Sequence, residues 1–175
     1  ALMGVCAGLL IGYWALMSFV PVPGHGAGNF AEGANLANYI DQQYLPLRKH
    51  DGDHDPEGLL STLPAIANVV AGFHVGKFLQ EKGMTYELLA KLLMTGALLL
   101  FLAWCWNLSF PINKKLWTSS FVLHTVGLDC IILSIIIYVI ECRKQTRWTY
   151  FFLVFGRNPL FIYLLSELGV TLLYV

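Results

Sequence analysis

Charged side chains are scarce in this chain. Lys, Arg, Asp and Glu make up 13% of the 175 residues, whereas a typical soluble domain carries about 25%. Such a composition cannot cover a water-exposed surface, while 57% of the residues are hydrophobic and the mean hydropathy is +0.61. We therefore predict an integral membrane protein. The formal net charge is zero, so nothing points to nucleic acid as a partner.

Paired cysteine motifs are also absent, and the first residues do not have the pattern of a leader. None of the four cysteines forms a CxxC pair, which favours free thiols in or beside apolar stretches: Cys6, Cys105, Cys130 and Cys142. The sequence opens with Ala1-Leu2-Met3-Gly4 inside an apolar stretch, with no charged region before it. It therefore does not resemble a signal peptide. We expect a part of a longer protein, with residues needed for activity outside this chain.

Long apolar stretches dominate what is present. A spanning helix needs about 20 mostly apolar residues, and five stretches qualify, at roughly 2–20, 59–79, 87–107, 117–141 and 149–174. The predicted fold is all-α: a polytopic membrane helical bundle of about five transmembrane helices, forming one domain over residues 1–175. Glycines at four-residue spacing mark faces where another helix can approach closely: Gly4, Gly8 and Gly12, then Gly72 and Gly76.

The orientation follows from basic residues in the connections. The 80–86 and 142–148 connections share one face with five such residues in or beside them: Lys77, Lys82, Arg143, Lys144 and Arg147. The opposite face has four: Arg48, Lys49, Lys114 and Lys115. The positive-inside rule predicts that the first face is cytoplasmic. The long extramembrane loop, residues 21–58, is then periplasmic or luminal.

Several ionisable residues fall within the predicted spans, where such groups face a bundle interior or a wet cavity. With a rise of about 1.5 Å per residue, Asp129 lies near the middle of its span. His124 and Glu167 lie near the outer face, and His74 lies toward the cytoplasmic one. Each has a plainer structural explanation: a packing histidine for His74 and His124, a helix-to-helix bond for Asp129, and solvation for Glu167.

Arg157 stands in Gly156-Arg157-Asn158-Pro159. Proline removes a backbone donor and clashes with the preceding turn, and glycine relaxes the helix beside it. We predict a kinked or broken helix next to a fixed positive charge, which is a plausible anion site.

The long loop ends in an acidic segment, His50 to Gly58. Its spacing does not fit a calcium loop, because Pro56 replaces the required glycine and Thr62 the bidentate glutamate. Two His and three Asp there could hold zinc, but a solvated acidic turn explains them better, and no metal is expected. Asp55-Pro56-Glu57-Gly58 is typical of a helix start. That role leaves a carboxylate able to face a ligand.

The 111–117 turn is predicted on the same outer face. Trp117 at a span boundary is typical of an interfacial anchor, although an indole also stacks on sugar faces. Asn113 and Lys114 can bond hydroxyls or carboxylates. Together the turn and the long loop would frame a site for a polar acceptor.

Four motifs occur in order: Asn38-Tyr39-Ile40-Asp41, Asp55-Pro56-Glu57-Gly58 with Leu59-Leu60-Ser61-Thr62, Pro111-Ile112-Asn113-Lys114-Lys115-Leu116-Trp117, and Gly156-Arg157-Asn158-Pro159-Leu160. From Val22-Pro23-Gly24 onward the chain resembles the C-terminal half of the heparan-α-glucosaminide N-acetyltransferase family and its bacterial relatives. The second and third motifs are the more specific.

The resemblance implies transfer of an acetyl group from acetyl-CoA, as co-substrate, to the amine of a terminal glucosamine across a membrane. It also implies that the catalytic histidine lies in the N-terminal half, outside this chain. That role is therefore not assigned to His25, His74 or His124.

On this basis we assign candidate roles by side of the membrane. The acceptor side receives Asp41, Asn113, Lys114 and Trp117; the CoA side receives His74, Arg157 and Asn158. An attacking amine needs a general base, and candidates to support it are Asp55, Glu57 and Glu167. Expected partners are the lipid bilayer, an amino-sugar or glycan acceptor, N-terminal helices of the same protein and a second copy. The expected location is a bacterial inner membrane, with the 21–58 loop periplasmic.

Two other functions fit the same pattern. Broken helices and midplane charges also occur in transporters and flippases for sugars or lipid-linked glycans. A purely structural subunit is a third reading, but it leaves Arg157 and Asp129 with no purpose beyond helix pairing. Binding of acetyl-CoA with release of free CoA separates the enzyme from the transporter.

Overall fold

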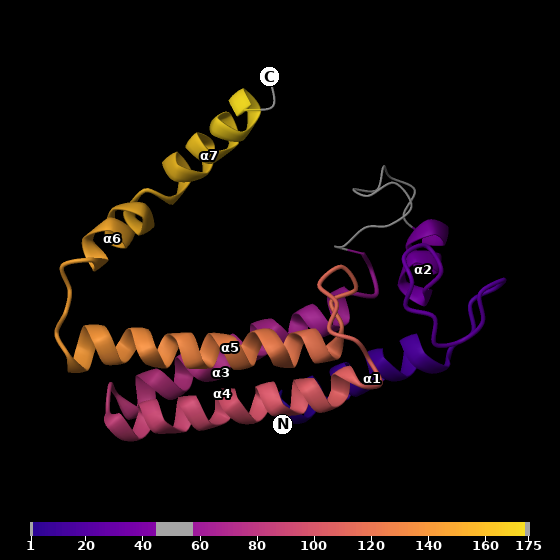
Figure 1. Ribbon diagram of the computed structural model, residues 1–175, viewed down its shortest axis with the longest axis horizontal. Helices are drawn as coiled ribbons and strands as arrows, with labels where there is room; N and C mark the ends of the chain where they lie inside the picture. The colour runs from indigo at the N-terminus through magenta and orange to yellow at the C-terminus, as the bar shows by residue number, and fades with distance from the viewer. Residues whose placement is uncertain (1, 45–57, 174–175) are drawn as a thin grey trace. The chain divides into compact units, whose positions relative to one another are not determined.

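The computed structural model describes residues 2–44 and 58–173, and within them the secondary structure is helical. In chain order (Figure 1) the helices are α1 (Leu2–Phe19), α2 (Leu36–Tyr44), α3 (Thr62–Lys82), α4 (Tyr86–Asn107), α5 (Ser119–Ile137) with a π-helical turn (Tyr138–Cys142), α6 (Thr149–Arg157) and α7 (Pro159–Leu173). The all-α prediction is confirmed. The segment from His50 to Glu57 lies outside the described residues.

Within the described part of the chain, four helices are long and apolar enough to cross a membrane: α1, α3, α4, and α5 with its π-helical turn. The pair α6 and α7 is a fifth candidate, bent by 92° at the break between them. The predicted break beside Arg157 is therefore present. Its cause is Pro159, which has no N–H to donate to the preceding turn, so α6 ends and α7 begins on either side of Asn158.

The chain divides into two compact units, Ala1–Ser134 and Ile135–Val175. In the first unit α1 packs along α3, and α5 forms a side-chain hydrogen bond with each of them. The Ser119 hydroxyl donates to the Leu10 carbonyl of α1 (2.7 Å), and the Asn68 amide of α3 donates to the Thr125 hydroxyl of α5 (3.3 Å). These bonds satisfy polar groups that would be costly in lipid.

Helices α4 and α5 approach each other closely at Gly96 and Gly127. A Cβ on Gly96 would come within 2.7 Å of the Gly127 carbonyl oxygen, and one on Gly127 within 2.9 Å of the Gly96 carbonyl oxygen. The absence of both side chains lets the two backbones touch. These two glycines do not belong to either predicted glycine face.

The predicted glycine faces are open instead. A Cβ added at any of five positions would meet no atom within 4 Å: Gly4, Gly8, Gly12, Gly72 and Gly76. No described residue therefore covers these faces. A partner helix for them, from the same protein or a second copy, stays a prediction.

The start of α3 lies later than predicted, at Thr62 instead of within Asp55 to Gly58. The Ser61 and Thr62 hydroxyls both donate to the Gly58 carbonyl, at 2.9 and 3.2 Å. They hold Gly58 in a turn that precedes the helix.

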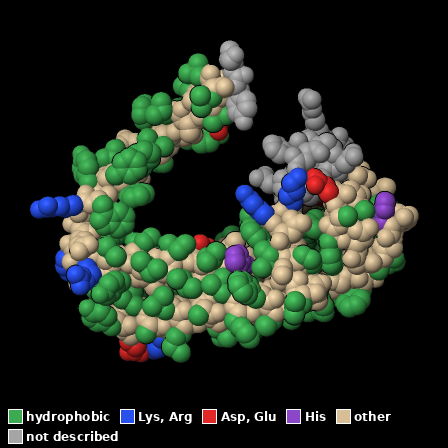
Figure 2. Space-filling view, viewed as in Figure 1, with side chains coloured by type: hydrophobic (Ala, Val, Ile, Leu, Met, Phe, Trp, Pro, Cys, Tyr) green, Lys and Arg blue, Asp and Glu red, His purple; other side chains and the backbone are tan. Residues whose placement is uncertain are grey.

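The surface of the helices is largely apolar (Figure 2). Phe101 and Trp104 of α4, for example, are 65% and 69% exposed. Such surfaces are stable against lipid rather than water. The four cysteines are free thiols, as predicted.

Candidate functional site

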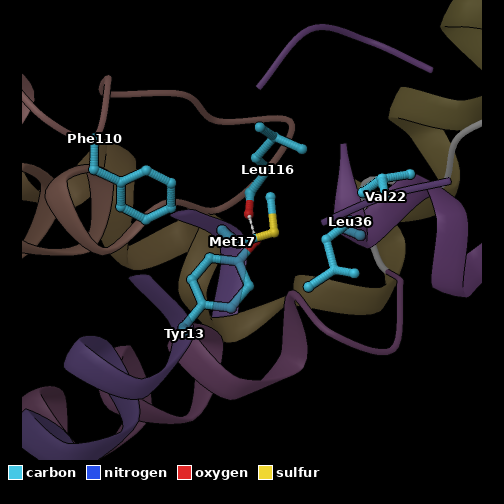
Figure 3. Close-up of a cluster of buried hydrophobic side chains, with 7 residues drawn as sticks. Tyr13, Met17, Val22, Leu36, Phe110 and Leu116 are labelled. Carbon is cyan, nitrogen blue, oxygen red and sulfur yellow. Dashed lines mark hydrogen bonds between the residues drawn. The ribbon is translucent and has the colours of Figure 1, made fainter. Parts of the chain in front are cut away.

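The two predicted polar loops meet at one end of the first unit, which we call the loop end: residues 20–35, α2, residues 58–61 and residues 108–118. Its core is a set of buried apolar side chains (Figure 3): Tyr13, Met17, Val22, Leu36, Ala37, Phe110 and Leu116. The Tyr13 hydroxyl donates to the Leu116 carbonyl (2.6 Å) and so ties α1 to the turn before α5. The segments that carry the two polar loops are therefore packed together at this end.

The turn before α5 is built around Asn113. Its Oδ1 accepts the N–H groups of Lys115 (2.8 Å) and Leu116 (3.4 Å). The Thr118 hydroxyl donates to the Pro111 carbonyl (2.9 Å) and accepts the Asn113 N–H (3.0 Å). Side chains thereby satisfy backbone groups that no helix satisfies. The amide nitrogen of Asn113 keeps no acceptor among the described residues, so it is available to a ligand.

Trp117 closes that turn in a left-handed conformation, with φ of 51°. Its Nε1 donates to the Asn68 Oδ1 of α3 (3.1 Å). Its ring packs edge-on against that of Phe121, with the ring centroids 5.3 Å apart. The indole is thus held against α3 and α5. Its contact with a sugar ring stays a prediction. Lys114, three residues earlier, is exposed.

Asp41 of α2 forms a hydrogen bond with the segment that precedes α3. It is 1% exposed, and its Oδ1 accepts the Leu59 N–H at 3.0 Å. Its carboxylate also lies against Gly58, where any Cβ would collide with it. The structure therefore gives this predicted acceptor residue a position inside the loop end. Asp55 and Glu57 lie outside the described residues.

A small cavity of about 30 Å³ lies between α2 and the turn before α5. We call it the Asn38 cavity; its lining is Phe30, Glu32, Asn35, Asn38, Asn113, Lys115 and Leu116. Glu32 and Lys115 form an ion pair of 2.9 Å between the two loops. Asn38 is fully buried, and neither atom of its amide group has a hydrogen-bond partner among the described residues.

His74 lies away from the loop end, in a cavity of about 310 Å³ lined by side chains of α1, α3, α4 and α5. Its Nδ1 donates to the Val70 carbonyl (2.9 Å), a tautomer assigned from that acceptor. This bond is the one expected of a packing histidine, and it leaves Nε2 able to accept. A contact of His74 with CoA stays a prediction.

Asp129 lines another cavity, of about 280 Å³, between α3 and α5. Asn68, Gly72 and Gly76 line it as well, so one of the open glycine faces forms its wall. Asp129 is exposed there. Intramembrane carboxylates face protein interiors or wet cavities by default, so a partner helix or a wet cavity at Asp129 stays a prediction.

The remaining predicted residues belong to the second unit. Arg157 is exposed at the last turn of α6, with no acidic partner among the described residues. The Asn158 side-chain amide donates a hydrogen bond to the Val154 carbonyl (2.9 Å) and so satisfies that backbone group near the helix break. Glu167 is exposed on α7.

Of the four predicted acceptor residues, Asn113 alone lines the Asn38 cavity. Four other polar residues of that cavity were not assigned a role from sequence: Glu32, Asn35, Asn38 and Lys115. The signal available for Asn38 was its place in the Asn-Tyr-Ile-Asp motif. The burial of the Asn38 amide depends on how the loops fold together, and so does the ion pair of Glu32 with Lys115, which are 83 positions apart. A local sequence pattern therefore reveals neither.

The helices and their apolar surfaces define a polytopic helical membrane protein. The chain is similar to the human heparan-α-glucosaminide N-acetyltransferase, with 28% identity over 91% of this chain. The mouse protein of the same name shows 28% identity over 87% of it. These similarities confirm the resemblance drawn from the motifs, although no protein-family model matches. The chain spans 29% and 28% of the length of these relatives.

Proposed function

We propose that the chain is part of a membrane acyltransferase that moves an acetyl group from cytoplasmic acetyl-CoA to an amino sugar on the opposite side. The observation that carries this proposal is the similarity to N-acetyltransferases along about nine tenths of the chain. The meeting of both motif-bearing loops at the loop end supports an acceptor site there.

In this reaction the amine nitrogen of the sugar attacks the carbonyl carbon of the thioester. The carbon–sulfur bond breaks, CoA leaves as its thiol, and a general base takes the proton that the amine loses. We propose that the base lies outside this chain, as the resemblance implies. Asp55, Glu57 and Glu167 remain the candidates to orient the sugar or assist that base.

On the acceptor side, the Asn113 amide nitrogen and the exposed Lys114 ammonium would donate to sugar hydroxyls. Asp41 and Trp117 would hold the loop segments that carry them, through their bonds to Leu59 and Asn68.

On the donor side, Arg157 at the helix break would pair with CoA phosphates, since a guanidinium binds phosphate through two parallel hydrogen bonds. Asn158, next to it in the chain, would assist it, and His74 in the first unit is a separate candidate to bind CoA. The cytoplasmic placement of this side, a bacterial inner membrane, a periplasmic 21–58 loop and pairing with a second copy belong to the same proposal.

A transporter or flippase for a sugar or lipid-linked glycan is the second candidate. The observation that favours it is the 92° break between α6 and α7, because discontinuous helices line many transporter sites.

Acetyl-CoA binding to the full-length protein tests the proposal, by calorimetry followed by detection of free CoA when glucosamine is added. Saturable binding and CoA release are expected. Asn113→Asp keeps the Oδ1 acceptor that shapes the turn but removes the amide nitrogen, so we expect a raised KM for the sugar and an unchanged KM for acetyl-CoA. Sugar binding without any acetyl-CoA binding would favour the transporter instead.

A further inference from the structure

Asp129 is a carboxylate near the middle of a membrane span. The span is the 24-residue segment Ser119–Cys142. Asp129 is exposed, and no described residue forms a hydrogen bond or an ion pair with it. An ionised group at that depth is costly in lipid, and such groups pair with another group or face a water-filled cavity. Asp129 therefore needs a partner that the described residues do not supply.

The groove beside Asp129 is framed by two helices in a defined register. Helices α3 and α5 both begin at the loop end and run in the same direction (Figure 1). The Asn68 amide of α3 donates to the Thr125 hydroxyl of α5 at 3.3 Å. About one helical turn farther along each helix lie Gly72 and Asp129, and both line the groove of about 280 Å³. The carboxylate thus lies level with a position that has no side chain.

Water is a poor partner for the carboxylate in this groove. Besides Asp129 and Asn68, the lining consists of apolar residues and glycines: Ala71, Gly72, Val75, Gly76, Leu79, Val126, Cys130 and Leu133. The Asn68 Oδ1 already accepts from Trp117, and its Nδ2 donates to Thr125. A buried water needs about two to four polar partners, and one carboxylate cannot provide them for a chain of waters. The groove therefore favours a protein partner.

We propose that a membrane-spanning helix of the same protein, from outside this chain, packs in the groove between α3 and α5 and presents a lysine or arginine to Asp129. An opposite charge at close range stabilises an ionised carboxylate far more in a bilayer than in water. A Cβ at Gly72 or Gly76 would meet no atom within 4 Å, and small residues such as glycine and alanine let another helix approach closely. Charge and shape together define the partner.

The basic group does not come from the described spans of the first unit. On α3, Lys77 pairs with Glu81 at 3.7 Å, and Lys82 is the last residue of the helix. On α4, Lys91 pairs with Glu87. The relatives offer a source, because this chain spans 29% and 28% of their length and most of each relative lies outside the matched part. The pairing concerns how the protein is assembled, so it does not depend on the acetyltransferase activity.

Neutralising Asp129 in the full-length protein distinguishes a basic partner from lipid or water. With a basic partner, Asp129→Asn leaves that charge buried and unpaired, so the thermal midpoint of unfolding in lipid nanodiscs falls by about 5 °C or more. A carboxylate that faces lipid or water alone is itself costly, so its removal would leave the midpoint level or raise it. Glu81→Gln makes the matched change at a carboxylate that is 58% exposed and should have little effect.

Photo-cross-linking identifies the partner helix and leaves Asp129 unchanged. Leu79→p-benzoylphenylalanine places the probe at the end of the groove, about two helical turns past Gly72. After irradiation of the full-length protein, mass spectrometry should find a peptide from a spanning segment outside residues 1–175. That segment should carry a lysine or arginine about two turns from the linked position. A peptide from residues 1–175, a lipid adduct alone, or a helix without such a residue would overturn the proposal.

Exchange of the two charges completes the test. Asp129→Lys should lower the midpoint more than Asp129→Asn, because two like charges then face each other. Replacing the identified lysine or arginine by aspartate in that variant should restore most of the loss. A double variant that is no more stable than Asp129→Lys alone would show that the two residues do not pair.

Discussion

The carboxylate of Asp41 lies where a side chain on Gly58 would have to be. Its Oδ1 accepts the Leu59 N–H at 3.0 Å, and a Cβ built on Gly58 would collide with the carboxylate. One residue belongs to the Asn-Tyr-Ile-Asp motif and the other to the Asp-Pro-Glu-Gly motif. Asp41 and Gly58, one from each motif, therefore meet in space, and each constrains the other.

Gly58→Ala should destabilise the full-length protein by about 1–3 kcal/mol, the usual cost of overpacking. Gly8→Ala is the matched control, because a Cβ there meets no atom within 4 Å. Thermal unfolding in detergent compares the two variants. Equal midpoints for both would contradict the contact with Asp41.

A double-mutant cycle isolates the pair. Asp41→Ala leaves the Leu59 N–H without this acceptor and should be destabilising on its own. In that background the alanine at position 58 no longer meets a carboxylate, so its additional cost should fall. Strictly additive effects would show that the two residues do not interact.

Much of the fold follows from local sequence. Stretches of about 20 apolar residues suffice to predict spans, and Pro159 suffices to predict the break after Arg157. The start of α3 was misplaced because a helix start at Asp55 to Gly58 has the right local chemistry. The turn that displaces it depends on Asp41, which is 17 residues from Gly58 and whose contact with it no local pattern reveals.

Gly96→Ala and Gly127→Ala should each destabilise the protein by about 1–3 kcal/mol, because each added Cβ meets the facing backbone of α4 or α5. Gly72→Ala serves as the control for a glycine in open space. Unfolding midpoints in lipid nanodiscs measure the difference. A larger effect at Gly72 than at Gly96 would place the tighter helix contact on the predicted glycine face instead.

Trp117→Phe keeps an aromatic ring but removes the Nε1 donor to Asn68. We expect a loss of about 1 kcal/mol in stability, with little change in the KM for the sugar, because phenylalanine keeps a ring that can stack on it. Trp104→Phe, at an exposed position of α4, should have little effect on either quantity. A raised KM at unchanged stability would instead mean that the indole itself contacts the sugar.

The candidate site was harder to predict than the spans. Asn113 was identified because an amide in an outer turn suggests hydroxyl recognition. Asn38 was not assigned a role, since nothing in the sequence distinguishes an asparagine that is buried and unpaired from one that caps a helix. Its burial and its place beside a cavity depend on how α2 packs against the turn before α5.

Transfer of acetyl across the membrane tests the central claim most directly. Vesicles containing the full-length protein are loaded with glucosamine, and acetyl-CoA labelled in the acetyl group is added outside. The account predicts N-acetylglucosamine carrying the label inside and free CoA outside. Labelled product that forms only when both substrates are on the same side, or glucosamine that crosses unmodified, would contradict it.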